Sequence, residues 1–427
     1  MTAPISNEYI NITADKSSST NSRNEKLRMR KTVKINSESS FDSKKSLESQ
    51  EEEEKPKRSL LQIFLILFAC VCAGFVFGWC LEKSRVFEPN SIRQQMIFKR
   101  WIMLKVFLTA VAVGQIVLIV LSLLPWTKDK FSTALKAYYC GFQNKSILTS
   151  AIGAFVLGSG MTICGACPGM VLSQVGTWTG NAYMTLLGAL TGALIYGLFA
   201  PWIVKFTKPK KPLEHHLIHE QFNINYIALA LPMAILLGVA VGLMEHFIPW
   251  REDYSSETTE GKNIFQYKIW PPYVCGILIG LLQAILVLFV NDTMGGSSSY
   301  VTIVSQWVVT ENLQKKFPYL ASARLGVANW WQVLYVCSAI IGALSSAAAS
   351  DTLSSTPGVH KAAAYFGGFI MLIGARFASG CTSGHGLSGM GVLAWLSFVA
   401  VPFMFGGGIA TAFIFKKCDI LIPTELN

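Results

Sequence analysis

Long uninterrupted runs of apolar residues alternate with short polar segments from residue 60 to residue 416. Each run is close to the ~20 apolar residues that a helix needs to cross a bilayer. The runs show no two-residue alternation, which excludes the strands of a membrane barrel, so we predict about nine transmembrane helices. The predicted spans are Leu60–Leu81, Trp101–Leu124, Ser146–Ile163, Gly180–Val204, Asn225–Pro249, Pro272–Val290, Trp330–Ser350, Lys361–Gly380 and Leu393–Phe415.

The composition agrees with an all-α integral membrane protein and excludes a conventional soluble enzyme. The 427 residues are 52% hydrophobic and 14% charged, whereas soluble domains are about 25% charged. Residues 1–58 differ, because they are rich in Ser, Asn, Lys and Glu and cannot bury enough apolar surface to offset their ordering entropy. We therefore expect a disordered polar tail over 1–58, a membrane domain over 59–417 and a short C-terminal tail over 418–427.

Two connectors between predicted spans are unlike water-exposed loops. Residues Cys164–Thr179 and Thr382–Val392 carry no Lys, Arg, Asp or Glu and are rich in Gly, Ser and Thr. Backbone of this kind is tolerated at membrane depth only where it lines a cavity or packs inside protein. The connectors are either tight turns between packed helices or short re-entrant helices that face a substrate, and we favour the second interpretation.

The two connectors share a spacing that indicates an internal repeat. Gly160 lies seven residues before Cys167, and Gly374 lies seven residues before Cys381. In each half of the chain, a span, a short apolar stretch and a second span precede the span that carries the motif. The short stretches are Ser91–Phe98 and Ser299–Val309.

This pattern predicts two copies of four spans each, over about 60–204 and 272–416, with a linking helix at 225–249. An even number of spans in each copy and one span between them place the second copy in the opposite orientation. The prediction is therefore a pair of inverted repeats, a common transporter construction with its binding site near the midplane.

Cysteine is the candidate chemical group in both motifs. A thiol is soft, donates weak S–H hydrogen bonds and exchanges sulfur reversibly, so Cys167 and Cys381 suit a sulfur-containing ligand. Cys164 and Cys167 also form a C-x-x-C pair, which is typical of a redox disulfide or half a zinc site. No second such pair accompanies it, so we expect no metal.

Charged residues inside the spans are few and therefore informative. Arg376 lies five residues before Cys381, and His385 lies four residues after it. A cation beside a thiol, with backbone N–H groups left accessible by Gly380, suits an anion, although Arg376 could instead bond helix-terminal carbonyls. Lys105 is expected to snorkel to its helix end, and Glu245 is a weak candidate for ion coupling.

The motif strings resemble a known family. GSGMTICGACPGM at 158–170 and GARFASGCTSGHGLSGMG at 374–391 are similar to the two signatures of the YeeE/YedE sulfur-transport family, whose bacterial members take up thiosulfate. SRVFEPNSIRQQM at 84–96 resembles the family segment after the first span. The resemblance covers roughly residues 60–416 and implies nine spans plus short helices in an hourglass with two internal copies.

The resemblance also implies a mechanism. Family cysteines pass thiosulfate through a narrow centre by weak S–H contacts, and two of them correspond to Cys167 and Cys381. A third family cysteine corresponds to Glu88 here. A carboxylate near an anion entrance repels a dianion unless it is paired or protonated, so this departure leaves the outer step of the relay open.

We therefore expect a membrane permease, not an enzyme, for thiosulfate or a related small sulfur-containing anion that cysteine thiols pass through a central constriction. The alternative is a membrane thiol enzyme that handles sulfane sulfur or forms a redox disulfide at Cys164/Cys167. The residues expected at the substrate are Cys167, Cys381, Arg376, His385, Gly160, Gly374, Gly380 and Cys164.

The sequence also predicts the location and the partners of the protein. The protein should be multi-pass in the lipid bilayer, without a cofactor and without a nucleic-acid partner, and a cytosolic sulfur-accepting protein is an expected partner. A slight excess of Lys and Arg in one set of flanking loops favours a cytosolic N-terminus. We expect the plasma membrane rather than an organelle.

Overall fold

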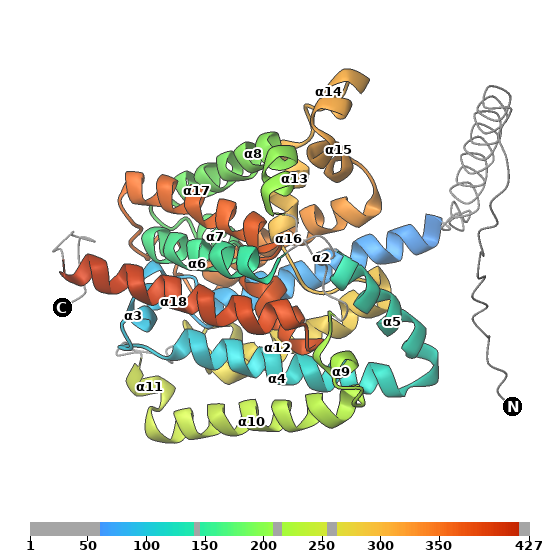
Figure 1. Ribbon diagram of the computed structural model, residues 1–427. Helices are drawn as coiled ribbons and strands as arrows, with labels where there is room; N and C mark the ends of the chain where they lie inside the picture. The colour runs from blue at the N-terminus through green and yellow to red at the C-terminus, as the bar shows by residue number, and fades with distance from the viewer. Residues whose placement is uncertain (1–59, 141–145, 208–215, 254–262, 418–427) are drawn as a thin grey trace, which may run out of the picture. The chain divides into compact units, whose positions relative to one another are not determined.

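The computed structural model describes residues 60–140, 146–207, 216–253 and 263–417, so both predicted tails lie outside the described residues. From Leu61 onward the described chain belongs to one compact unit. It is built of helices packed side by side (Figure 1), and its described part contains no strand beyond one isolated bridge between Leu217 and Ala394. The all-α prediction is confirmed.

Eight helices in the described part are long and apolar enough to cross a membrane, and a bent pair makes a ninth span. The bent pair is α17 (Lys361–Ala378) followed by the π-helical turn η3 (Thr382–Gly389), at an angle of 42°. This confirms the prediction of about nine spans. The other spans are α2 (Leu60–Lys83), α4 (Ile102–Leu123), α6 (Ile147–Cys164), α8 (Ala182–Thr207), α10 (Tyr226–Phe247), α12 (Pro272–Ile285) with η2 (Leu286–Val290), α16 (Val327–Ala349) and α18 (Trp395–Lys417).

Short helices occupy the segments between spans that the sequence singled out. The predicted short stretches form α3 (Pro89–Met96) and α13 (Ser297–Val304), and the first uncharged connector contains α7 (Met170–Gly176). All three helices are largely buried. The remaining short elements are α5 (Pro125–Cys140), α9 (Ile218–Gln221), α11 (Trp250–Asp253), η1 (Ile264–Gln266), α14 (Glu311–Lys316) and α15 (Pro318–Arg324).

The helices α6 and α17 lie side by side (Figure 1), and they pack at very close range because glycines line their contact. A Cβ atom on Gly160 would collide with the backbone of Met371, and one on Gly374 would collide with the backbone of Leu157. Gly153, near the start of α6, meets the end of α17 at Ala378. The contacts therefore run in opposite sequence order, and the two helices are antiparallel.

A partly buried ion pair attaches α10 to α4. The Nζ atom of Lys105 lies 2.7 Å from Oε2 of Glu245 and also donates to the carbonyl of Ile248. The prediction that Lys105 snorkels to water is wrong, because its side chain is fully buried between the two helices. Glu245, the acidic coupling candidate, neutralises a lysine that would otherwise be buried without a partner.

Candidate functional site

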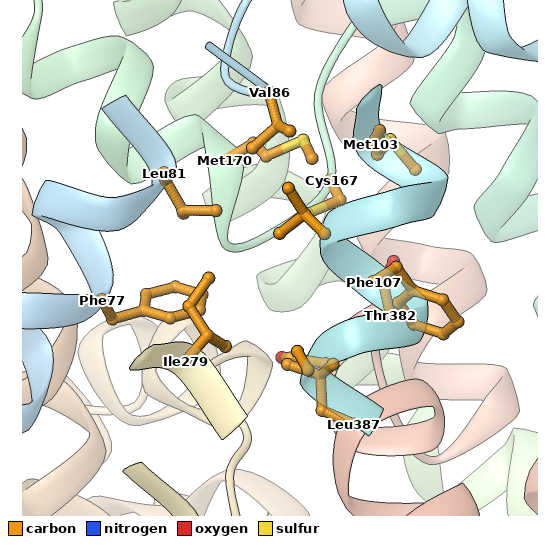
Figure 2. A pocket seen from close by; sticks show the side chains of 13 residues that line it. Phe77, Leu81, Val86, Met103, Phe107, Cys167, Met170, Ile279, Thr382 and Leu387 are labelled. Carbon is orange, nitrogen blue, oxygen red and sulfur yellow. The ribbon is translucent and has the colours of Figure 1, made fainter. Parts of the chain in front are cut away.

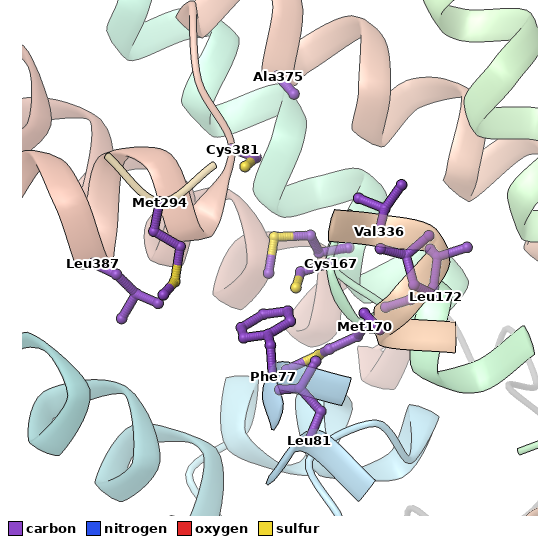
Figure 3. Packing of buried hydrophobic residues seen from close by; sticks show 14 of the residues in the cluster. Phe77, Leu81, Cys167, Met170, Leu172, Met294, Val336, Ala375, Cys381 and Leu387 are labelled. Atoms are coloured by element: carbon purple, nitrogen blue, oxygen red, sulfur yellow. The ribbon is translucent and has the colours of Figure 1, made fainter. Parts of the chain in front are cut away.

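Cys167 and Cys381 follow two helix ends of the same geometry. Helix α6 is closed by Gly165 at φ 64° and α17 by Ser379 at φ 67°, so a left-handed residue lies two positions before each cysteine. A residue in this conformation ends a helix sharply. Both cysteines are buried: Cys167 is 9% exposed and Cys381 is 2% exposed. Both belong to one hydrophobic cluster (Figure 3).

The thiol of Cys167 opens on a cavity of about 60 Å³ that we call the apolar cavity. No charged side chain lines it, and its polar side chains are those of Cys167, Thr382 and Ser383 (Figure 2). The lining residues are Phe77, Leu81, Val86, Met103, Val106, Phe107, Ala110, Cys167, Met170, Ile279, Thr382, Ser383 and Leu387.

The thiol of Cys381 faces a second, larger cavity of about 180 Å³, which we call the polar cavity. Charged, hydroxyl and backbone groups dominate its wall, in contrast to the first cavity. The lining residues are Ala137, Tyr138, Asp292, Thr293, Met294, Gly295, Gly296, Ser297, Ser298, Gln332, Arg376, Ser379, Gly380, Cys381 and Gly384.

Arg376 is the cation of the polar cavity. It lies in the last turn of α17 and is 8% exposed. Its guanidinium donates to the hydroxyl of Ser297 and, at 3.5 Å, to that of Ser298. Its Nε atom has no hydrogen-bond partner, and the described residues place no carboxylate within ion-pair distance of it. Serine hydroxyls can rotate, so this guanidinium is suited to an anionic ligand.

One hydroxyl lies beside the sulfur of Cys381. The Sγ atom of Cys381 lies 3.2 Å from the Oγ atom of Ser383. The same cavity wall contains Gly296, Ser297 and Gly384.

His385 packs against the second motif on the side away from the cavities. It is fully buried and lines neither cavity. One ring nitrogen lies 3.1 Å from Ser397 Oγ, and the other lies 3.0 Å from the carbonyl of Ala378. A Cβ atom on Gly380 would approach the imidazole to 2.8 Å, so glycine at this position lets the ring pack under the turn.

The remaining predicted site residues lie in helix contacts. The Sγ atom of Cys164 lies 3.5 Å from the carbonyl of Ala166, and its residue packs against Gly367. Gly160 and Gly374 lie in the contact between α6 and α17. The structure thus brings Cys167, Cys381, Arg376 and Gly380 to the cavities, and it places Cys164, His385, Gly160 and Gly374 in the packing that surrounds them.

Glu88, where the family resemblance implies a cysteine, is a paired carboxylate. Its Oε1 atom lies 2.6 Å from a terminal nitrogen of Arg85, and Arg100 lies 3.9 Å from its other oxygen. Val86, in the same segment, lines the apolar cavity. The charge of Glu88 is therefore balanced by two arginines, and Glu88 itself is not among the residues that line this cavity.

Sequence reasoning missed part of the polar cavity. The hydroxyls of Ser297 and Ser298 were not identified, although a run of Gly and Ser at 295–299 follows shortly after a span. Asp292 was missed as well, and burial raises the pKa of this carboxyl to about 6. Within residues 60–140, 146–207, 216–253 and 263–417, no three His, Cys, Asp or Glu side chains are grouped to hold a metal ion.

Comparison with known proteins decides the family, because the model of the sulphur transport family matches residues 83–410. The chain belongs to the sulphur transport family. It is 26% identical over 360 residues to the thiosulfate transporter TsuA of Spirochaeta thermophila. The matched region covers 82% of this chain and 99% of that protein. It is 24% identical over 361 residues to thiosulfate transporter TsuA of Escherichia coli, covering 80% and 92%.

A third relative is shorter. A probable transporter of Xylella fastidiosa is 29% identical over 143 residues, which is 34% of this chain and 92% of that protein. The resemblance drawn from the motif strings is thereby confirmed. The chain is a multi-pass membrane protein of a sulphur transport family.

Proposed function

We propose that this protein is a permease for thiosulfate or a related small sulfur-containing anion, and that the thiols of Cys167 and Cys381 contact the anion at a central constriction. The observation that supports this most strongly is the position of the two thiols. Each follows an equivalent helix end, and each opens on a different cavity. The names of the two longer relatives support thiosulfate as the substrate.

The chemistry of the two cavities fits the two ends of such an anion. Thiosulfate carries charged oxygen atoms at one end and a soft terminal sulfur at the other. Arg376, Ser297 and Ser298 supply a positive charge and hydroxyls to the oxygens. The thiols and the apolar walls accommodate the terminal sulfur, because this soft end of the anion does not need hydrogen-bond donors in place of strong hydration.

We further propose that residues 60–204 and 272–416 are inverted copies, linked by the helix at 225–249. The antiparallel contact of α6 with α17 supports this proposal. So does the left-handed residue that precedes each cysteine by two positions. The thiol-enzyme alternative has less support, since the Cys164 thiol bonds backbone carbonyls and reaches neither cavity.

The side of the membrane to which each cavity lies nearer follows if the N-terminus is cytosolic and the protein lies in the plasma membrane. The apolar cavity is lined by Leu81, near the end of α2, and by Met103, near the start of α4. The polar cavity is lined by Asp292, which follows η2 on the face where α2 begins. An incoming anion would then leave through the polar cavity, where a cytosolic sulfur-accepting protein would receive it.

The experiment is uptake of radiolabelled thiosulfate into liposomes that contain the purified full-length protein. We expect uptake above that of protein-free liposomes, with intact thiosulfate recovered from the lumen. A Cys167→Ala/Cys381→Ala double variant of normal thermal stability is the matched control and should be inactive. Absence of uptake by the wild type would contradict the permease, and recovery of a converted sulfur compound would favour the enzyme.

A further inference from the structure

The short helix α13 contacts both cysteine motifs. At its first residue, the hydroxyl of Ser297 accepts a hydrogen bond from the guanidinium of Arg376, in the last turn of α17. Three residues later, the hydroxyl of Tyr300 donates to the carbonyl oxygen of Pro168 at 2.8 Å, and Pro168 directly follows Cys167. One helix of eight residues therefore joins the end of α17 to the loop that carries the first thiol.

The two contacts come from one face of α13. Residues three positions apart are neighbours on a helix surface, and Ser297 and Tyr300 are 4% and 2% exposed. A tyrosine side chain has two rotatable χ angles, so its hydroxyl is held at a well-defined distance from the helix. The position of α13 therefore sets where Pro168 lies relative to Arg376.

The loop between α6 and α7 is held on both sides of Cys167. Before the cysteine, the Nε2 atom of Gln174 donates to the carbonyl of Gly165 at 2.9 Å. After the cysteine, Tyr300 donates to the carbonyl of Pro168. Gln174 belongs to α7 in the same half of the chain, whereas Tyr300 comes from the other half. The tyrosine bond therefore ties the first thiol to the half of the chain that carries the second.

The short helix of the first half, α3, offers a comparison. Arg93 of α3 donates to the carbonyls of Thr162 and Ile163 in the last turn of α6, at 3.1 Å and 2.6 Å. Each short helix thus contacts the motif helix of its own half. Counted from the first helical residue, however, α3 has Ile92 where α13 has Tyr300. An isoleucine side chain cannot bond a carbonyl, so the bond between the two halves is a feature of α13.

We propose that Tyr300 is a positioning residue, whose hydroxyl holds the Cys167 loop at the distance from Arg376 and Cys381 that passage of the sulfur anion requires. The proposal rests on the permease function and adds the residue that aligns its two thiols. Tyr300 lines neither cavity, so it acts through the loop and not on the anion. Without the hydroxyl, the buried carbonyl of Pro168 loses this donor, which favours movement of the loop toward other donors.

The first test is uptake by a full-length Tyr300→Phe protein, reconstituted in liposomes and supplied with radiolabelled thiosulfate over a range of concentrations. Phenylalanine keeps the ring and removes only the hydroxyl. We expect the maximal rate per folded molecule to fall about fivefold, as for the loss of one hydrogen bond. The KM should change by less than about twofold, because Arg376 and both thiols remain.

The second test reads the position of each thiol directly. The purified protein is treated with N-ethylmaleimide, and peptide mass spectrometry gives the alkylation rates of Cys167 and Cys381 in the same sample. A buried thiol reacts through locally open states, so loss of one bond from its loop should raise the rate at Cys167 about fivefold. Cys381 should keep its wild-type rate, whereas a general loosening of the fold would raise both rates together.

Tyr226→Phe is the matched control. The hydroxyl of Tyr226, on α10, donates to the carbonyl of Gly391 at 2.8 Å, and its side chain is buried and lines neither cavity. The same atom is therefore lost from a bond of the same length. We expect a lower thermal unfolding midpoint in both variants, with wild-type uptake and a wild-type alkylation rate at Cys167 in Tyr226→Phe.

Two outcomes would overturn the proposal. One is a Tyr300→Phe protein that has the maximal rate of the wild type, and the other is a slower protein in which both cysteines are alkylated faster to the same extent. Failure of the wild type itself to take up thiosulfate would instead refute the permease function. The alkylation rates do not depend on uptake, so the two failures are distinguishable.

Discussion

The surroundings of Cys167 and Cys381 differ far more than their backbones do. Each cysteine follows a left-handed residue by two positions and lies at the end of one of two antiparallel helices. Yet one thiol opens on an apolar cavity and the other on a cavity that contains Arg376. The comparison teaches that similar helix ends can place thiols alike while neighbouring segments decide what each thiol can bind.

The physical consequence is a division of work along the proposed path. An oxyanion in the apolar cavity loses hydration and finds few donors in return, which is unfavourable. The polar cavity contains a guanidinium and serine hydroxyls, which are groups that can replace the water lost by an anion. Transfer between the chambers should therefore be the sensitive step, and the variants below alter one chamber at a time or, as a control, neither.

The largest effect is expected for Cys381→Ala. This change removes the thiol that faces the polar cavity, and we expect uptake to fall about a hundredfold, the upper range for one hydrogen bond to a charged group. Initial uptake rates in liposomes, normalised to folded protein, measure the effect. Cys167→Ala should behave alike, and normal uptake by a well-folded Cys381→Ala protein would rule out the thiol relay.

Arg376 tests whether the polar cavity differs from the apolar cavity by its charge. Arg376→Ala should lower uptake by at least about tenfold, because a charge-assisted contact to the anion is lost. Arg376→Lys keeps the charge without the planar fork and should retain part of the rate. Thiosulfate titration of both variants gives the KM, and equal transport by Arg376→Ala and wild type would show that the charge is not used.

Asp292 adds a pH dependence that the apolar cavity cannot have. Burial raises the pKa of Asp292 to about 6, so the carboxyl becomes neutral as the pH falls below this value. Loss of a negative charge from the polar cavity should raise anion uptake about threefold between pH 7.5 and pH 5.5. The measurement keeps the same pH on both sides of the liposome, and Asp292→Asn should flatten the profile. A wild-type rate that falls over this interval would contradict the assignment.

The smallest effect is expected for Cys164→Ala. This thiol reaches neither cavity, and its hydrogen bonds go to backbone carbonyls. Uptake should stay within about twofold of wild type, as for a small packing change. Cys164→Ala is therefore the matched control for both cysteine variants. A loss as large as that of Cys167→Ala would instead support a functional C-x-x-C pair.

The number of spans and the two breaks were accessible from the sequence. A span is recognised from the length and polarity of a continuous segment, and such local properties do not depend on the rest of the fold. The breaks at Cys167 and Cys381 were likewise marked by local glycine and serine. Family resemblance then supplied the chemistry that the spacing alone left open.

The assignment of side chains to cavities required the tertiary structure. Ser297 bonds Arg376 across 79 positions of sequence, and no local pattern reports which of several serine runs will meet an arginine. Gly160 and Gly374 were expected near the substrate, but the structure puts them where two helix backbones touch. Glycine suits both a substrate site and a close contact between helices, so its presence in the sequence does not distinguish these two roles. Helix packing decides which groups share a cavity, because burial and electrostatics depend on neighbours from distant segments.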